Sequence, residues 1–366
     1  AAERIAVALL TTPDSVGASG PGKLAVLNVT SGRIESTVYA GFFPSSMRLV
    51  GRTLYLALVG EHKLLVYDLS GGQPRLRRTI ATGRAPQNLC ADDAHVYVVN
   101  SGSDDVSAVS LTSDSVVATY RVRFPGPQGA AARYGGAPTS CAVSKGKLYV
   151  TAANLNAVAV FDVGSAAAGS GAEPIGFFPT AWYPTKVLAD SGRLVVLSAK
   201  GIRARRPNPQ GPQAIADTRT SGPDYVLTLL RGSLAVLPDT VIPGRLAAWT
   251  EQVAQGTPLY SASDGLRLPI RHVFYIVREN RSWDQVMGDL GRGEADSSLT
   301  LFGERFTPVG HQIAREFVAL DHFYADGEIS VLGHSFTTSG YASPFLEWLG
   351  NTTYAARYRG YPFGTV

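Results

Sequence analysis

The chain has little charge for its length and few cysteines. Of its 366 residues only 17% are Asp, Glu, Lys or Arg, and the formal net charge is +4. The basic residues are scattered apart from Arg203, Arg205 and Arg206, so no nucleic-acid-binding surface is indicated. No run reaches the roughly 18 to 20 apolar residues of a membrane span, so we expect no transmembrane segment.

The two cysteines, Cys90 and Cys141, are too few for the disulfide framework of a small secreted domain and lack the spacing of a zinc finger. We expect both to be buried as small hydrophobic residues. Turn-forming residues are frequent in contrast, with 39 glycines and 22 prolines, which indicates a β-rich portion.

A loose internal repeat runs through the first two-thirds of the chain. Similar segments begin at Pro44, Pro86, Pro138 and Pro184, which lie 42, 52 and 46 residues apart by subtraction. Each repeat reads as a strand led by the proline, an LYV-type strand, a third strand with alternating apolar residues, and a fourth strand. Four short strands in about 40 to 45 residues predict the blade of a β-propeller.

Two flanking segments bring the count to about five blade units. Residues 5–37 read as an earlier blade that lacks its inner strand, and residues 194–237 as a last blade with a long insertion at 201–222. The units resemble YVTN-type, lactonase-like propeller repeats. Such rings usually have seven blades, so the resemblance implies that about two blades lie outside this chain. Nothing polar recurs at a position that would indicate catalysis on the propeller axis.

A helical pattern follows the repeats, with Leu246, Trp249 and Val253 on one face of residues 246–255. We expect this helix to bridge two domains. Turn residues then lead into the next segment, which places the domain boundary near Thr257.

An apolar run from Ile270 to Val277 precedes the polar pair Glu279 and Asn280. Its β-branched and aromatic residues predict a strand buried on both faces of a parallel sheet. Ligands bind beyond the carboxyl ends of such strands, so the pair is expected where a metal or a phosphate is met. Ser282 is expected to cap a helix over residues 282–290.

A second helix and strand are predicted beyond this point. Thr307 followed by Pro308 predicts a helix start, and that helix should extend to about Arg315. The sequence FVALDHF at residues 317–323 reads as a second buried strand. Strand, helix and strand in about 50 residues predict a parallel α/β sheet. The expected fold class is therefore multidomain, with an all-β propeller followed by part of an α/β domain.

The motif RENRSWD at residues 278–284, together with residues 299–342, resembles the phosphoesterase branch of the alkaline phosphatase superfamily. That branch includes bacterial acid phosphatases and phospholipase C enzymes. A YVTN-like propeller followed by such a phosphoesterase is similar to known two-domain bacterial fusion proteins. The resemblance covers about 100 residues of a domain that normally continues for several hundred.

The resemblance implies roles for four residues. Glu279 and Asn280 would ligate a divalent metal ion, which could be zinc, calcium or magnesium. Ser330 matches the nucleophile at the start of a helix and would also contact the metal. His334 lies one helical turn later and would face the same cleft. The alternative is structural: Glu279 pairs with a neighbouring arginine, Arg278 or Arg281, Asn280 caps the helix, and Ser330 is an ordinary cap.

Four further residues are minor candidates. Ser335 and Thr337 rank behind Ser330 as nucleophile, and His322 and Asp326 could also contribute to the site.

The predicted domains are the propeller blades at residues 1–245, the linker helix and loop at 246–268, and the N-terminal part of a phosphoesterase domain at 269–366. The chain reads as truncated at both ends, because it starts at Ala1 and stops inside an unfinished domain. We expect the full-length protein to be a metal-dependent phosphoesterase acting on a phosphate ester, exported to the periplasm or secreted. This chain alone should have little turnover, and the propeller's partner is unknown. The alternative is a non-catalytic propeller scaffold with a degenerate phosphatase-like domain.

Overall fold

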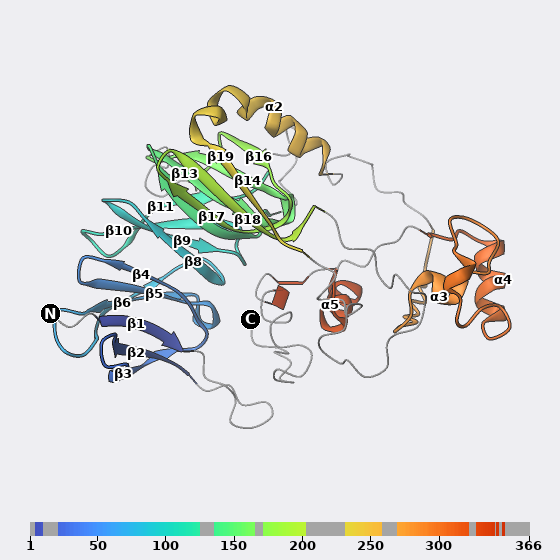
Figure 1. The fold of residues 1–366 in the computed structure, drawn as a ribbon, viewed down its shortest axis with the longest axis horizontal. Helices are drawn as coiled ribbons and strands as arrows, with labels where there is room; N and C mark the ends of the chain where they lie inside the picture. The colour runs from blue at the N-terminus through green and yellow to red at the C-terminus, as the bar shows by residue number, and fades with distance from the viewer. Residues whose placement is uncertain are drawn as a thin grey trace. The chain divides into compact units, whose positions relative to one another are not determined.

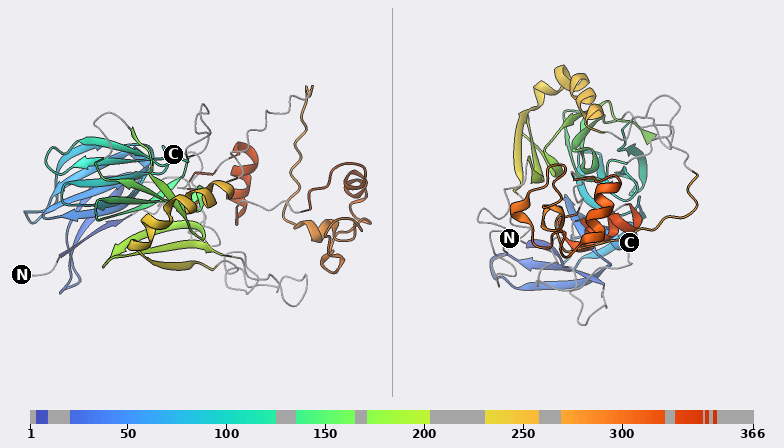
Figure 2. Two further views of the ribbon diagram at one scale, coloured as in Figure 1. Left: turned by 90° about the horizontal axis from the view of Figure 1, so that it is seen from above. Right: turned by 90° about the vertical axis from the view of Figure 1, so that its right-hand side faces the viewer.

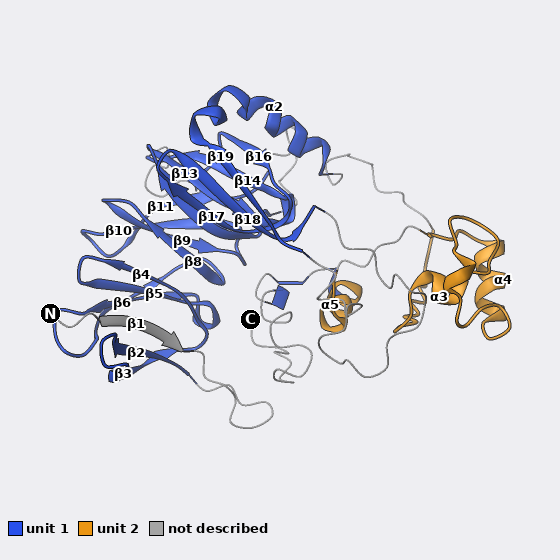
Figure 3. Ribbon diagram, in the orientation of Figure 1, with its two compact units in different colours: residues 1–204, 230–261, 339–366 blue, residues 205–229, 262–338 orange. Residues whose placement is uncertain are grey.

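The computed structural model describes residues 4–9, 21–124, 135–164, 171–202, 231–257, 269–321, 327–340, 342–343 and 346–347. The chain divides into two compact units, which Figure 3 colours separately. Unit 1 comprises residues 1–204, 230–261 and 339–366, and unit 2 comprises residues 205–229 and 262–338.

The described residues of unit 1 form five sheets that follow one another along the chain (Figure 1). Sheet 1 has β1 (Arg4–Leu9), β2 (Gly22–Asn28) and β3 (Ile34–Gly41). Sheet 2 has β4 (Pro44–Val50), β5 (Thr53–Leu58), β6 (Lys63–Asp68) and β7 (Arg75–Ala81). Sheet 3 has β8 (Pro86–Ala91), β9 (His95–Asn100), β10 (Asp105–Ser110), β11 (Val116–Arg121) and the short β15 (Gly171–Ala172).

Sheet 4 has β12 (Pro138–Ser144), β13 (Lys147–Ala152), β14 (Ala157–Asp162) and β16 (Gly176–Pro179). Sheet 5 has β17 (Trp182–Asp190), β18 (Arg193–Gly201) and β19 (Ser233–Pro238). Among the described strands, every pairing is antiparallel except that of β15 with β11. The predicted four-strand order is confirmed in sheets 2 to 4, and Figure 1 shows a propeller-like but open series of the described sheets.

The sheets pack face to face, and their first strands are neighbours: β4 contacts β8, β8 contacts β12, and β12 contacts β17. In each of sheets 2, 3 and 4, one tyrosine fills the core at the same position of the second strand. Tyr55, Tyr97 and Tyr149 are 1%, 0% and 4% exposed, and each belongs to the apolar cluster toward the following sheet. The tyrosine of the LYV-type pattern is therefore the residue of each of these repeats that packs between one sheet and the next.

A recurring hydrogen bond joins each sheet to the next. The residue before each leading proline has a left-handed backbone, although it is not glycine; these residues are Phe43, Ala85, Ala137 and Tyr183. In three cases its N–H donates to a left-handed residue of the preceding sheet: Ala85 to His62 Nδ1 (3.1 Å), Ala137 to Asp104 Oδ1 (2.8 Å) and Tyr183 to Asn156 Oδ1 (2.9 Å). We call these three bonds the sheet clamps.

Cys90 and Cys141 are buried as predicted, but they are not free. They form a disulfide that joins β8 to β12, with 5.7 Å between the Cα atoms. Their 51-residue separation gave no sign of the bond, because it depends on the two first strands lying side by side. The expectation of two unbonded hydrophobic residues was therefore wrong.

The helix predicted over residues 246–255 is α2 (Ile242–Gln255), and its apolar face lies against β16 (Figures 1 and 2). Thr250 Oγ1 accepts from the N–H of Phe177 at 2.8 Å, so the helix also satisfies the outer edge of sheet 4. Short 3-10 turns lie at Val59–Glu61, Ala153–Leu155 and Asp239–Val241. None of the described helices is long and apolar enough to cross a membrane.

Unit 2 contains α3 (Trp283–Met287), a 3-10 turn (Ser297–Leu299), α4 (Pro308–Glu316) and α5 (Ser330–Ser339). Ser282 and Thr307 immediately precede α3 and α4, so both predicted helix starts are confirmed. α3 ends at Met287, short of the predicted residue 290. A small core of Met287, Leu290 and Ala314 joins the two helices.

The two strands predicted for the second domain are not observed. The run from Ile270 to Val277 has no regular structure, and Phe274 is 91% exposed. Phe317 to Leu320 likewise forms no strand, with Val318 83% exposed; residues 322 and 323 lie outside the described residues. A doubly buried strand needs partners on both edges and cover on both faces, and no described strand pairs with either run. The described residues therefore show no clear α/β domain.

Candidate functional site

The polar pair Glu279 and Asn280 lies just before α3. Asn280 has a left-handed backbone, with φ of 64°, which asparagine tolerates better than most residues. Its carbonyl oxygen accepts from Arg281 Nη1 at 2.6 Å. The helix cap is Ser282, whose N–H donates to Gln285 Oε1 at 3.3 Å. The alternative in which Asn280 caps the helix is therefore wrong.

Glu279 contacts a residue far along the chain. Its Oε2 atom lies 3.1 Å from His334 Nε2, and both side chains are about half exposed, at 50% and 52%. The neighbouring Arg281 instead lies over the ring of Phe302, 5.1 Å from its centre. The partner that the structure shows for Glu279 is thus His334 on α5, one of the four predicted site residues.

Ser330 is the first residue of α5, and its side chain is exposed. Three later hydroxyl side chains of this helix, those of Ser335, Thr337 and Thr338, donate to the helix backbone. Ser335 Oγ donates to Val331 O at 3.0 Å, and Thr337 Oγ1 donates to Gly333 O at 2.7 Å. No described residue accepts from or donates to the Ser330 hydroxyl, which distinguishes it from the two minor candidates.

The helix places Ser330 and His334 together. Residues four apart lie on the same face of an α-helix, separated by one turn. His334 contacts Glu279, so the carboxylate and the imidazole lie about one helical turn along α5 from Ser330, and Asn280 directly follows Glu279. A carboxylate in contact with an imidazole, one helical turn from an exposed serine, is an arrangement suited to nucleophilic chemistry.

The oxygen atoms of Glu279, Asn280 and Ser330 suit a hard divalent cation, which prefers carboxylate, amide and hydroxyl ligands. The described residues contain no group of three or more His, Cys, Asp or Glu side chains that could hold a metal ion. The minor candidates His322 and Asp326 lie outside the described residues. The match between Glu279, Asn280 and Ser330 and a divalent cation is therefore one of donor type, namely oxygen ligands of the kind that magnesium or calcium prefers.

Sequence reasoning missed a second hydroxyl, imidazole and carboxylate set. His311 on α4 is fully buried, with Nε2 2.8 Å from Asp289 Oδ1 and Nδ1 3.0 Å from Thr307 Oγ1. Hydrogen bonds from the Glu304 backbone N–H and from His311 hold the pKa of the Asp289 carboxyl below its ordinary value. Because the imidazole is closed off from solvent, this set stabilises unit 2. The spacing of Thr307 and His311, one helical turn, was the available signal.

A polar group was also missed near the first strands of unit 1. Lys186 Nζ and Ser140 Oγ both donate to Asn88 Oδ1, at 3.4 and 3.3 Å. Burial lowers the pKa of the Lys186 ammonium, and the nearby Arg48 guanidinium lowers it further. Asn88, Ser140 and Lys186 each stand two residues after a leading proline, so a fixed offset within the repeat could have revealed them.

Comparison with known proteins leaves the family open. No protein-family model and no curated protein matches the chain. Solved structures with some likeness include the hydrazine synthase of Kuenenia stuttgartiensis, with a TM-score of 0.41, 13% identity and coverage of 59% of this chain and 56% of that chain. A proposed 6-phosphogluconolactonase from Bacteroides uniformis gives a TM-score of 0.36, 16% identity and coverage of 53% and 64%.

The computationally designed Ika8 protein gives a TM-score of 0.37, 14% identity and coverage of 48% of this chain and 50% of that chain. The chain thus spans less than two thirds of the length of each of these structures. At TM-scores below 0.5, these likenesses identify neither a family nor a function. The fold itself defines a β-rich, propeller-like unit joined in one chain to a small helical unit.

Proposed function

We propose that residues 279–334 carry the reacting groups of a metal-dependent phosphoesterase with Ser330 as the nucleophile. One observation carries the proposal: Glu279 contacts His334, one helical turn from an exposed serine hydroxyl at the start of α5. Glu279 precedes Ser330 and His334 by more than 50 positions in the sequence, and its contact with His334 supports the proposal.

Each residue has a role that follows from its chemistry. The Ser330 oxygen attacks phosphorus, the bond from phosphorus to the leaving oxygen breaks, and water later hydrolyses the phosphoserine. N–H groups in the first turn of α5 stabilise negative charge on the phosphoryl oxygens. His334, oriented by Glu279, receives the hydroxyl proton. A divalent cation held by Glu279, Asn280 and Ser330 would lower the pKa of the hydroxyl and neutralise phosphoryl charge.

The propeller-like unit serves in this proposal as a scaffold or binding domain for the enzyme. The disulfide between Cys90 and Cys141 supports export, because disulfides persist in oxidising compartments such as the periplasm and the extracellular space. We therefore retain periplasmic or secreted location as part of the proposal.

Metal titration and turnover test the proposal separately. Manganese binding, followed by electron paramagnetic resonance, should be weak and should weaken about tenfold further in Glu279→Gln, while Glu251→Gln on exposed α2 serves as the matched control. Turnover of 4-nitrophenyl phosphate and its diester with zinc, calcium or magnesium should be low. Ser330→Ala should remove whatever metal-dependent turnover exists, and Ser335→Ala should keep it. Turnover that survives Ser330→Ala would contradict the proposed nucleophile.

The second candidate is a propeller scaffold with a degenerate phosphatase-like part. The observation that favours it is that the described residues hold no group of three or more metal-ligating side chains. No saturable manganese binding, together with no turnover that depends on Ser330, would support this scaffold function over the enzyme.

A further inference from the structure

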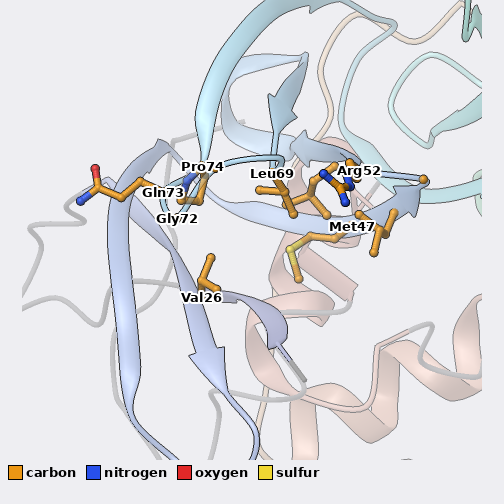
Figure 4. Close-up of a pocket in the computed structure, with 11 residues that line it drawn as sticks. Val26, Met47, Arg52, Leu69, Gly72, Gln73 and Pro74 are labelled. Atoms are coloured by element: carbon orange, nitrogen blue, oxygen red, sulfur yellow. The ribbon is translucent and has the colours of Figure 1, made fainter. Parts of the chain in front are cut away.

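A pocket of about 440 Å³ lies between sheets 1 and 2 (Figure 4). Its walls come from β2, from β4 and β5, and from the loop before β7. Figure 4 shows Val26 across the pocket from Leu69 and Pro74, with Met47 and Arg52 toward one end and Gln73 toward the other. A volume in this range is typical of sites that take one small organic ligand.

The pocket lies at the one described interface between sheets where the repeated tyrosine is replaced. The register pairs Tyr55 with Val66, Tyr97 with Ala108 and Tyr149 with Val160. In sheet 1 the same register position pairs Ala6 with Val26, a residue of the pocket wall. The sequence thus has alanine at the register position where sheets 2 to 4 have tyrosine.

The walls combine apolar surface with a single free charge. Leu54 and Val26 are 2% and 7% exposed, and Pro74 is buried beside them. Arg52 lines the same pocket, and no described carboxylate pairs with its guanidinium group. Apolar walls favour a hydrophobic body, while an unpaired guanidinium group favours an anionic end.

We infer that this pocket binds a small amphipathic anion, with an aromatic or medium-chain aliphatic body against Val26, Leu54 and Leu69 and one acidic group on Arg52. This binding site is independent of the phosphoesterase proposal, since none of its residues belongs to unit 2.

Two fluorescent probes of similar shape test the inference on the full chain. The probe 8-anilinonaphthalene-1-sulfonate carries the acidic group, and N-phenyl-1-naphthylamine lacks it. Both should bind at one site with enhanced fluorescence. Arg52→Gln should weaken sulfonate binding at least fivefold and change binding of the neutral probe less than twofold. Arg78→Gln, an exposed arginine of β7 outside the pocket, is the matched control and should change neither.

Filling variants test the place of binding. Val26→Phe and Leu69→Phe each enlarge a residue of the pocket wall, and each should reduce binding of both probes at least tenfold. Thermal melts monitored by circular dichroism show whether each variant is folded, and a folded variant of either kind suffices. Decanoate should displace the sulfonate probe from the unmodified protein. Equal probe binding in Arg52→Gln, or unchanged binding in a folded filling variant, would overturn the inference.

Discussion

At the scale of single residues, the sheet clamps are the clearest link between sequence and fold. Each uses a left-handed residue as acceptor, and His62, Asp104 and Asn156 all carry a side-chain atom that can accept a hydrogen bond. Left-handed backbone costs an ordinary residue roughly 1–2 kcal/mol, and Asn and Asp bear this cost more easily. A polar side chain at this position of the repeat therefore does two things: it accepts the hydrogen bond, and in Asp104 and Asn156 it also lowers the cost of the left-handed backbone.

Replacing Asn156 should separate these two effects. Asn156→Gly removes the bond to the Tyr183 N–H but keeps an easy left-handed backbone, so it should lower the free energy of unfolding by about 1 kcal/mol. Asn156→Ala adds the backbone cost and should lose about 2–3 kcal/mol. Asn156→Asp keeps an acceptor and is the control. Urea denaturation measures all three, and an Ala variant no weaker than the Gly variant would contradict the backbone argument.

Local signals predicted the residues whose role depends on near neighbours. Ser282 and Thr307 start helices because a cap needs only the next turn of chain. The start of α5 at Ser330 agrees with the motif in the same way. Glu279 and His334 were both predicted as site residues, but their contact was not. It depends on the tertiary placement of α5 near residue 279, which no local pattern shows.

At the scale of elements, the internal repeat predicted the sheets of unit 1. The two strands predicted from apolar composition in the second domain are not observed. Antiparallel strands joined by short turns are specified by alternation and turn residues close in sequence. A parallel strand is specified by partners far away, which composition does not show. The run at Ile270–Val277 has the composition of such a strand, yet it is exposed and unpaired among the described strands. Apolar composition thus identified a segment that could form a buried strand, but the segment forms no strand because no described strand pairs with it.

The disulfide joins two elements that no local pattern connects, β8 and β12. A loop of about 50 residues closed by a disulfide is stabilised by roughly 2–4 kcal/mol, mainly because the unfolded chain is restricted. Cys90→Ser with Cys141→Ser should therefore lower the melting temperature of unit 1 by roughly 5–15 °C. Calorimetry with and without dithiothreitol checks this. The double variant is insensitive to the reductant, and an unmodified protein equally insensitive under full reduction would argue against a stabilising bond.

At the scale of the whole molecule, different interactions stabilise the interior of each unit. Unit 1 has apolar layers between sheets and one disulfide. Unit 2 has a small core and a set of polar contacts in which Asp289 accepts from the Glu304 backbone and Glu304 accepts from Arg315 at 2.6 Å. Compact units with separate cores need not unfold together, so we expect two transitions on heating.

Acid should separate these two transitions further. The pKa of Asp289 is lowered by its hydrogen bonds, and the pKa of Glu304 is lowered by Arg315. Their stabilisation of unit 2 is complete above the ordinary carboxyl pKa near 4 and is lost as the pH falls from there through the lowered pKa of each folded carboxyl. In unit 1 the shifts oppose one another, since hydrogen bonds lower the pKa of Asp92 while burial raises that of Asp104. From pH 6 to 3.5 the unit 2 transition should therefore fall more.

Calorimetry at pH 6, 4.5 and 3.5 measures both transitions in one sample. Dithiothreitol at pH 7 assigns them, because only unit 1 contains the disulfide. Asp289→Asn removes one of the titrating groups, so its unit 2 transition should begin lower at pH 6 and depend less on pH. Parallel shifts of the two transitions, or an unchanged pH dependence in Asp289→Asn, would mean that the polar contacts around His311 do not set the acid stability of unit 2.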